Sequence, residues 1–220
     1  MDFEKAYLNY KEHKIEFDEN FRIKLHRAFS WLKQADEAPN EDLRYICLWI
    51  AFNSVYGKER EPQNIGTTLG DRQSFQRYLA VISNLDKKNR IITAIRKNLK
   101  EIIRELLENR YTFQPYWDYY NGKKEFSEWE RAFQKAKKLA IQELTEGGTA
   151  QILSIVFDRL YTLRNQILHG GATCGSQINR KQLHDGCLIL ETLIPVILEI
   201  MISKPDTEIW GEPYYPHVHD

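Results

Sequence analysis

The apolar residues of this chain recur at helical spacing along most of its 220 residues, and no segment shows the strict alternation of a β-strand. The clearest stripe has intervals of 3, 4, 3 and 4 residues and consists of Leu153, Val156, Leu160, Leu163 and Ile167. A similar stripe runs through residues 180–203. Stripes of this kind cover one face of a helix, and helices bury them by packing together. The sequence therefore predicts an all-α fold, a helical bundle.

The expected helices alternate with polar or Gly/Pro-marked connections. In chain order they span about 18–34, 41–56, 71–85, 87–109, 127–143, 149–169 and 180–203. The second is apolar all round, so it is expected to lie in the core. Thr149 is expected to cap the helix that follows Gly147-Gly148, and Pro195 to kink or locally break the last one.

No internal repeat or low-complexity linker divides the chain. We therefore expect residues 1–220 to form a single domain. Its core helices lie at about 18–57 and 149–203, and a helical insertion at about 58–148 separates them. The aromatics of the tail IWGEPYYPHVHD suggest that it packs over the bundle.

The charges of the chain cancel, with 31 basic and 31 acidic residues. This argues against a protein that coats long nucleic acid by neutralising phosphates, but not against an enzyme that contacts a few of them. Cys47 and Cys187 lie in apolar runs, which indicates buried reduced thiols rather than a secreted disulfide framework. The N-terminus has no apolar signal segment, and the apolar run 188–202 is too short to span a bilayer. These features predict a cytoplasmic protein without a membrane segment.

Polar residues follow one line of the helix that is expected to end at His169. Asp158, Thr162, Asn165 and His169 stand at offsets of 0, 4, 7 and 11, which places them on one stripe. Arg164 falls between this stripe and the apolar one. A polar row beside an apolar row is also what an ordinary surface helix shows, so spacing alone leaves both interpretations open.

The residue types at this helix end suit RNA cleavage. His169 can exchange protons near neutral pH, and Arg164 carries a permanent charge shaped for phosphate oxygens. Asn165 can orient a hydrogen-bonded group. Together they could promote attack of a ribose 2′-hydroxyl on phosphorus, in which Arg164 stabilises the charge that develops. The nucleophile belongs to the substrate, so this chemistry requires no metal and no cofactor.

The segment LRNQILHGG has the form Arg-polar-x-x-x-His and resembles the signature of HEPN domains. The upstream helix LRYICLWIAFNSVYG is similar to the arrangement in larger bacterial members, and the resemblance covers about residues 41–57 and 150–202. It implies a HEPN-like bundle of about four core helices, often a homodimer with two motifs facing each other. It also implies metal-independent RNA cleavage in many members, often as a toxin or an anti-phage effector.

The resemblance departs from its pattern at Asn53, near which many similar proteins place an acidic residue. An amide could hydrogen-bond Arg164 or the substrate, but it could not hold the arginine by charge. Other members are not nucleases; they bind nucleotidyltransferases or act as binding modules. An antitoxin or a nucleotidyltransferase is therefore an implied partner.

These observations favour a dimeric, metal-independent endoribonuclease acting on RNA. Arg164, His169 and Asn165 are the expected catalytic residues, with Asn53, Asp158 and Thr162 in substrate-binding or supporting positions. The alternatives are a non-catalytic HEPN module that binds a partner protein or a nucleotide, and a structural subunit. Three further sites are weaker candidates, because an ordinary surface or packing role is favoured for each: a metal site in the terminal HVHD, RNA contacts by the basic segment 86–110, and base stacking by the aromatics of 116–120.

Overall fold

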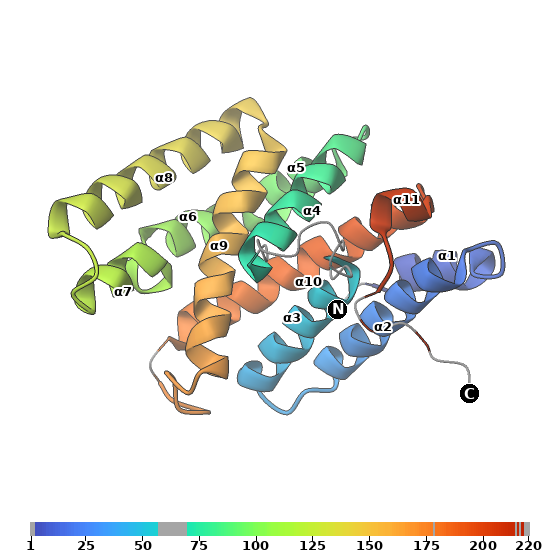
Figure 1. The fold of residues 1–220 in the computed structure, drawn as a ribbon, viewed down its shortest axis with the longest axis horizontal. Helices are drawn as coiled ribbons and strands as arrows, with labels where there is room; N and C mark the ends of the chain where they lie inside the picture. The colour runs from blue at the N-terminus through green and yellow to red at the C-terminus, as the bar shows by residue number, and fades with distance from the viewer. Residues whose placement is uncertain (1–2, 57–69, 178, 214, 216, 218–220) are drawn as a thin grey trace.

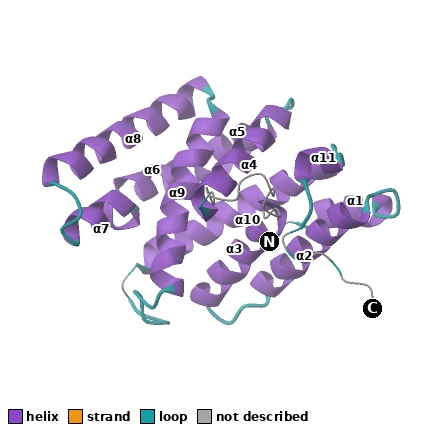
Figure 2. Cartoon of the chain, in the orientation of Figure 1, coloured by secondary structure: helices purple, strands orange, loops and turns teal. Residues whose placement is uncertain are grey.

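The computed structural model describes residues 3–56, 70–177, 179–213, 215 and 217. In this part of the chain every regular element is a helix, which confirms the all-α prediction (Figures 1 and 2). The α-helices are, in chain order, α1 (Glu4–His13), α2 (Glu19–Asp36), α3 (Glu41–Tyr56), α4 (Asp71–Leu85), α5 (Arg90–Ala94), α6 (Lys100–Glu108), α7 (Gln114–Tyr120), α8 (Phe126–Glu146), α9 (Thr149–Leu168), α10 (Arg180–Ile202) and α11 (Thr207–Trp210). A π-helical turn, Ile95–Leu99, joins α5 to α6, and a 3-10 turn, Arg110–Thr112, precedes α7.

Helices α2 and α3 form a hairpin that packs against α10 (Figure 1). Residue Asn40 accepts a hydrogen bond from the Leu43 N–H at 2.9 Å, which caps the start of α3. Nine residues of α3 are buried, as its all-round apolar sequence predicts. At the crossing with α10, Gly186 allows close approach, because a Cβ there would lie 2.7 Å from the Tyr45 ring.

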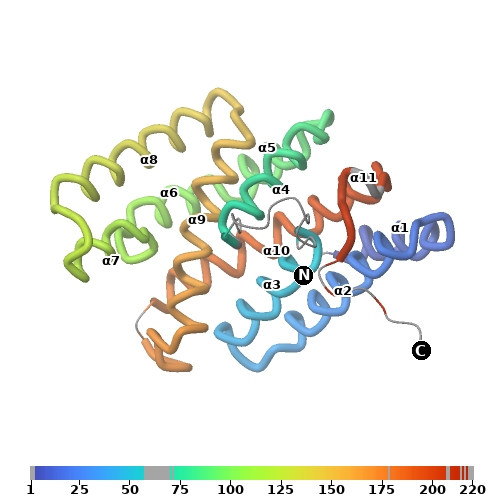
Figure 3. The backbone as a smooth tube through the Cα atoms, viewed as in Figure 1, coloured from blue at the N-terminus to red at the C-terminus, as the bar shows by residue number. Residues whose placement is uncertain are grey.

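Helix α9 connects this hairpin to the section of residues 71–146. It contacts α4, α6 and α8 as well as α3 and α10, and Figure 3 shows it with α7 and α8 on one side and α3 and α4 on the other. An aromatic cluster fills the junction: the Phe52 and Phe157 ring centroids lie 4.5 Å apart, and Phe75 meets Trp49 edge-on at 6.2 Å. One hydrophobic core therefore runs through both the expected core helices and the expected insertion.

Several short elements were not predicted. Helix α7 occupies the expected aromatic connection 111–124, where Pro115 stands at the start of a helix, a position that tolerates proline. Helix α1 is held by tertiary contacts, because the Tyr10 ring stacks on Phe29 at 5.3 Å. Helix α11 ends at Trp210, which is 1% exposed and stacks on Phe21, so the start of the aromatic tail packs on the bundle as expected, whereas Tyr215 is 73% exposed. The expected loop 58–70 lies outside the described residues except for Gly70.

One local prediction is wrong, and a second is wrong in part. Thr149 is the first residue of α9 rather than its cap; its hydroxyl donates to the Gly147 carbonyl at 3.4 Å, and Gly148 holds the cap position. Pro195 does not break the last helix, since α10 continues to Ile202. Leu193, Ile194, Ile197 and Leu198 beside Pro195 are fully buried, and their packing outweighs the backbone hydrogen bond that proline cannot make.

Candidate functional site at the end of helix α9

The six residues Arg164–His169 form the final turn and the cap of α9. The His169 N–H donates to the Asn165 carbonyl at 3.0 Å, and Gly170 follows with φ of +70°, a conformation that suits glycine at a helix end. The motif therefore ends at a fixed point, where the chain turns away from the helix axis.

Arg164 is half-buried, and two neighbouring side chains contact its guanidinium. Its Nη1 donates to Asn165 Oδ1 at 2.9 Å, and its Cζ lies 5.7 Å from the centre of the Tyr161 ring. The Nε–H is buried and has no hydrogen-bond partner among the described residues. Asn165 thus orients the arginine, as the sequence predicts for an amide at this position, and leaves a donor for another group.

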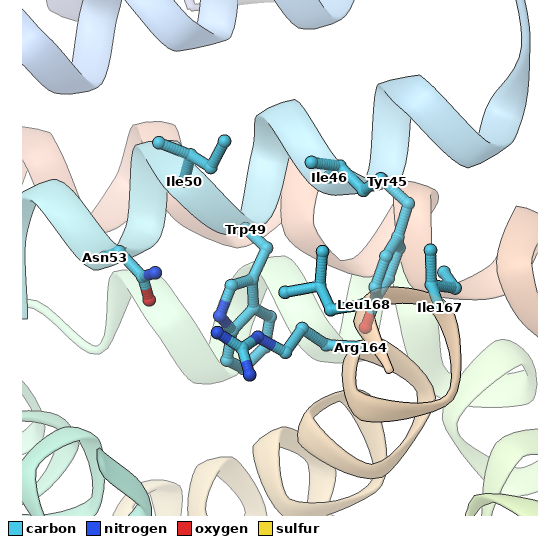
Figure 4. Close-up of a pocket in the computed structure, with 8 residues that line it drawn as sticks. All are labelled: Tyr45, Ile46, Trp49, Ile50, Asn53, Arg164, Ile167 and Leu168. Carbon is cyan, nitrogen blue, oxygen red and sulfur yellow. The ribbon is translucent and has the colours of Figure 1, made fainter. Parts of the chain in front are cut away.

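A cavity of about 110 Å³ lies between α3 and α9 and receives the Arg164 side chain (Figure 4). The two helices line it with one stripe each: Tyr45, Ile46, Trp49, Ile50 and Asn53 from α3, and Arg164, Ile167 and Leu168 from α9. The Tyr45 hydroxyl donates to the Leu160 carbonyl at 2.7 Å, which fixes that end of the cavity, and burial raises its pKa. Leu168 is 47% exposed, so the cavity opens to the surface beside it.

Asn53 lies on the same cavity as Arg164, extending from the opposite wall in Figure 4. The two side chains share the cavity without a hydrogen bond between them, since Asn53 Oδ1 is buried and finds no partner in the described chain. Trp49, only 1% exposed, likewise leaves its indole N–H unpaired. The cavity therefore brings together three polar atoms that no described protein group satisfies.

His169 stands apart from this cavity. It is exposed and is not among the lining residues, and none of the described side chains forms a hydrogen bond with its imidazole. Residues five apart on a helix point about 140° away from each other, which explains why the Arg164 and His169 side chains diverge. One chain therefore presents the arginine inside the cavity and the histidine on the surface outside it.

Asp158 and Thr162 do not line this cavity. Asp158 accepts hydrogen bonds from Arg72 Nε at 2.7 Å and from Gln76 Nε2 at 2.9 Å, and this pairing raises the pKa of Arg72. Thr162 is 3% exposed, and its hydroxyl donates to the Asp158 carbonyl. The predicted polar stripe is thus divided: Asp158 joins α9 to α4, Thr162 bonds within α9, and Asn165 contacts Arg164 at the cavity.

Sequence reasoning did not identify Trp49 or Gln166. Gln166 Nε2 donates to the Tyr111 carbonyl at 2.6 Å, and its Oε1 accepts from Asn179, so this residue fixes the end of α9 to the turns before α7 and α10. Its place between Asn165 and His169 in the motif was the available signal. Trp49 gave none, because an all-round apolar helix does not show which side chain faces a gap.

The other candidate sites receive less support. Arg96 of the basic segment donates to the carbonyls of Leu144 and Thr145, and Tyr116 packs edge-on against Trp129 with ring centres 5.1 Å apart. Both groups therefore contribute to packing. Within the described residues, no cluster of three or more His, Cys, Asp or Glu side chains is arranged to hold a metal ion; the last residues of HVHD lie outside that part.

Two general expectations can also be compared with the structure. Cys47 and Cys187 are buried free thiols, as expected, and burial raises the pKa of both; Cys174 is exposed. No helix in the described ranges is long and apolar enough to cross a membrane.

The geometry above is the basis for assigning a function, because the chain matches no family model, no curated protein and no solved structure. The resemblance to HEPN domains stays a prediction that rests on the sequence motif.

Proposed function

We propose that this protein is an endoribonuclease that cleaves RNA at the end of α9 by attack of the ribose 2′-hydroxyl, without a catalytic metal ion. One observation carries the proposal. The Arg164 guanidinium is positioned by Asn165 and Tyr161 and lines the cavity, and its buried Nε–H has no partner among the described residues. A fixed cation with free donors is suited to the charge that gathers on phosphate oxygens in the transition state.

The reaction conserves all atoms of the substrate. The 2′-oxygen loses its proton and bonds to phosphorus, the bond between phosphorus and the 5′-oxygen breaks, and that oxygen takes up a proton. The products are a 2′,3′-cyclic phosphate and a 5′-hydroxyl. His169 is exposed and able to exchange protons with a bound substrate, and Arg164 stabilises the phosphate.

We propose further that the active form is a homodimer. Two proton transfers are needed, and one chain presents only one histidine at this helix end. A two-fold axis beside Leu168 would bring a second His169 toward the Arg164 of the first chain. Leu168 and Leu43, on α9 and α3, are 47% and 43% exposed and supply apolar surface for such an interface.

The biological role follows from the resemblance alone. Cleavage of RNA by HEPN proteins often serves as a toxin or in phage defence, and we propose the same role here, with an antitoxin or a nucleotidyltransferase as the partner.

A second candidate function is a non-catalytic module that binds a nucleotide. The specific observation in its favour is the separation of His169 from the cavity that holds Arg164 and Asn53. In that case the cavity binds a ligand that the protein does not cleave.

Incubation of the purified full-length protein with a mixed RNA pool in EDTA distinguishes the two. The nuclease proposal predicts that cleavage persists in EDTA and leaves 2′,3′-cyclic phosphate ends. It also predicts that a 2′-deoxyribose at the cut site prevents cleavage there. Products with 5′-phosphate ends, or a strict requirement for a divalent ion, would contradict the mechanism. Binding of RNA without any cleavage would favour the second candidate.

A further inference from the structure

The cavity between α3 and α9 is surrounded by polar atoms that the protein leaves unpaired. The Trp49 indole N–H, the Asn53 amide oxygen and the Arg164 Nε–H are all buried, and none has a partner within the described residues. Buried polar groups are costly to leave unpaired, and native proteins seldom do so. Three of them around one cavity indicate that it receives a polar ligand.

The size and walls of the cavity suit the edge of one planar ring. Its volume is about 110 Å³, which is less than the roughly 150 Å³ of a closed cavity that holds benzene, so part of the ring would project through the opening beside Leu168. Ile46, Ile50 and Leu168 form apolar walls that can contact the faces of such a ring. Leu168 also marks the opening, and His169 follows it in the chain, so the rest of the ligand would leave the cavity toward the histidine.

The unpaired atoms further specify the ring. Trp49 and Arg164 each offer a donor, and Asn53 Oδ1 offers an acceptor, so the complementary ligand has two acceptors and one donor. Uracil and cytosine both have this set on their exposed edge. Guanine has one acceptor and two donors there, and adenine has one of each. The cavity therefore matches a pyrimidine better than a purine.

We propose that this cavity recognises a pyrimidine base of single-stranded RNA. The inference rests on the proposed function, since it assigns the substrate of the same site. Proteins read unpaired RNA bases through hydrogen bonds to these edges. Arg164 can serve both base and phosphate, because its side chain lines the cavity and the guanidinium has five N–H donors in all. The base would thereby hold the adjoining phosphate beside Arg164 and His169.

The test is a calorimetric titration of the full-length protein with uridine, cytidine, adenosine and guanosine 3′-monophosphates in EDTA. We expect the two pyrimidine nucleotides to bind at least tenfold more tightly than the two purine nucleotides. Asn53→Leu removes the acceptor and should abolish this difference. Ser54→Ala is the matched control, since Ser54 is the next residue of α3, donates to the Ile50 carbonyl and does not line the cavity.

The wild-type comparison is decisive by itself, even where a variant fails to fold. Equal affinity for all four nucleotides, or no binding of any, would overturn the proposal and indicate a cavity that holds water. Cleavage of RNA after all four bases alike, unchanged in Asn53→Leu, would overturn it while the nuclease proposal stands. Pyrimidine-selective binding by a protein that does not cut RNA would support the cavity assignment and contradict the nuclease proposal.

Discussion

Replacing Asn53 with leucine should stabilise the fold while it abolishes the preference of the cavity for pyrimidines. The Asn53 Oδ1 atom is buried beside a mainly apolar cavity and has no hydrogen-bond partner in the described structure. Removing this oxygen therefore breaks no hydrogen bond that it accepts. An unpaired buried polar group costs about 1–3 kcal/mol, and leucine also favours a helix over asparagine by a few tenths of a kcal/mol. The expected gain in the free energy of unfolding is therefore about 1–3 kcal/mol.

Urea denaturation at pH 7 measures this gain as a higher midpoint with an unchanged slope. For a domain of this size, each kcal/mol also raises the melting temperature by about 2–4 °C. Ser54→Ala, one residue further along α3, should stay within about 0.5 kcal/mol of the wild type. A loss of stability in Asn53→Leu would refute the reasoning, because it would mean that the amide is paired and serves the fold rather than a ligand.

Two further predictions concern buried and paired charges. Burial lowers the pKa of Arg159 to about 9, and its guanidinium lies 4.1 Å from the Phe113 ring and 4.9 Å from the Phe133 ring. That shift corresponds to a cost of roughly 5 kcal/mol for burying the charge, and each ring offsets about 2 kcal/mol of this cost. Arg159→Met should therefore match or slightly exceed the stability of the wild type in urea denaturation. A loss of about 3 kcal/mol in the free energy of unfolding would contradict this. The pKa of Asp42 is lowered below its usual value of 3.8, mainly because Arg180 donates hydrogen bonds to the carboxylate. The pair therefore stabilises the fold above about pH 3.8, and this stabilisation is lost as the pH falls through the pKa of Asp42 in the folded protein. Asp42→Asn should therefore reduce stability at pH 7 and flatten the acid limb of a urea-midpoint series below about pH 4; an unchanged acid limb would be inconsistent with the pairing.

The sequence predicts the long helices well because their signals are local. Helix α3 begins and ends as expected, since Asn40 caps it and an apolar run fills it. Helices α1 and α7 escape prediction because they are short and depend on contacts with distant residues, such as the stacking of Tyr10 on Phe29. Propensity and periodicity contain no information on such contacts.

The candidate site shows the same division. Arg164 and Asn165 are found from the motif, and the structure joins them by a hydrogen bond. Asp158 shares their stripe, but Arg72, 86 positions away in the sequence, engages it instead. Spacing along one helix shows which residues share a face; only the packing of α4 decides which of them remain available.

The parallel measurement of RNA cleavage and thermal stability in His169→Ala tests the central claim most directly. His169 is exposed, so its removal should change stability by no more than about 0.5 kcal/mol, whereas loss of a proton-transfer group should slow cleavage about a hundredfold or more. His26→Ala, an exposed histidine on α2, serves as the control and should leave both unchanged. We predict loss of cleavage at unchanged melting temperature. Cleavage at the wild-type rate by folded His169→Ala would contradict the assignment of the site.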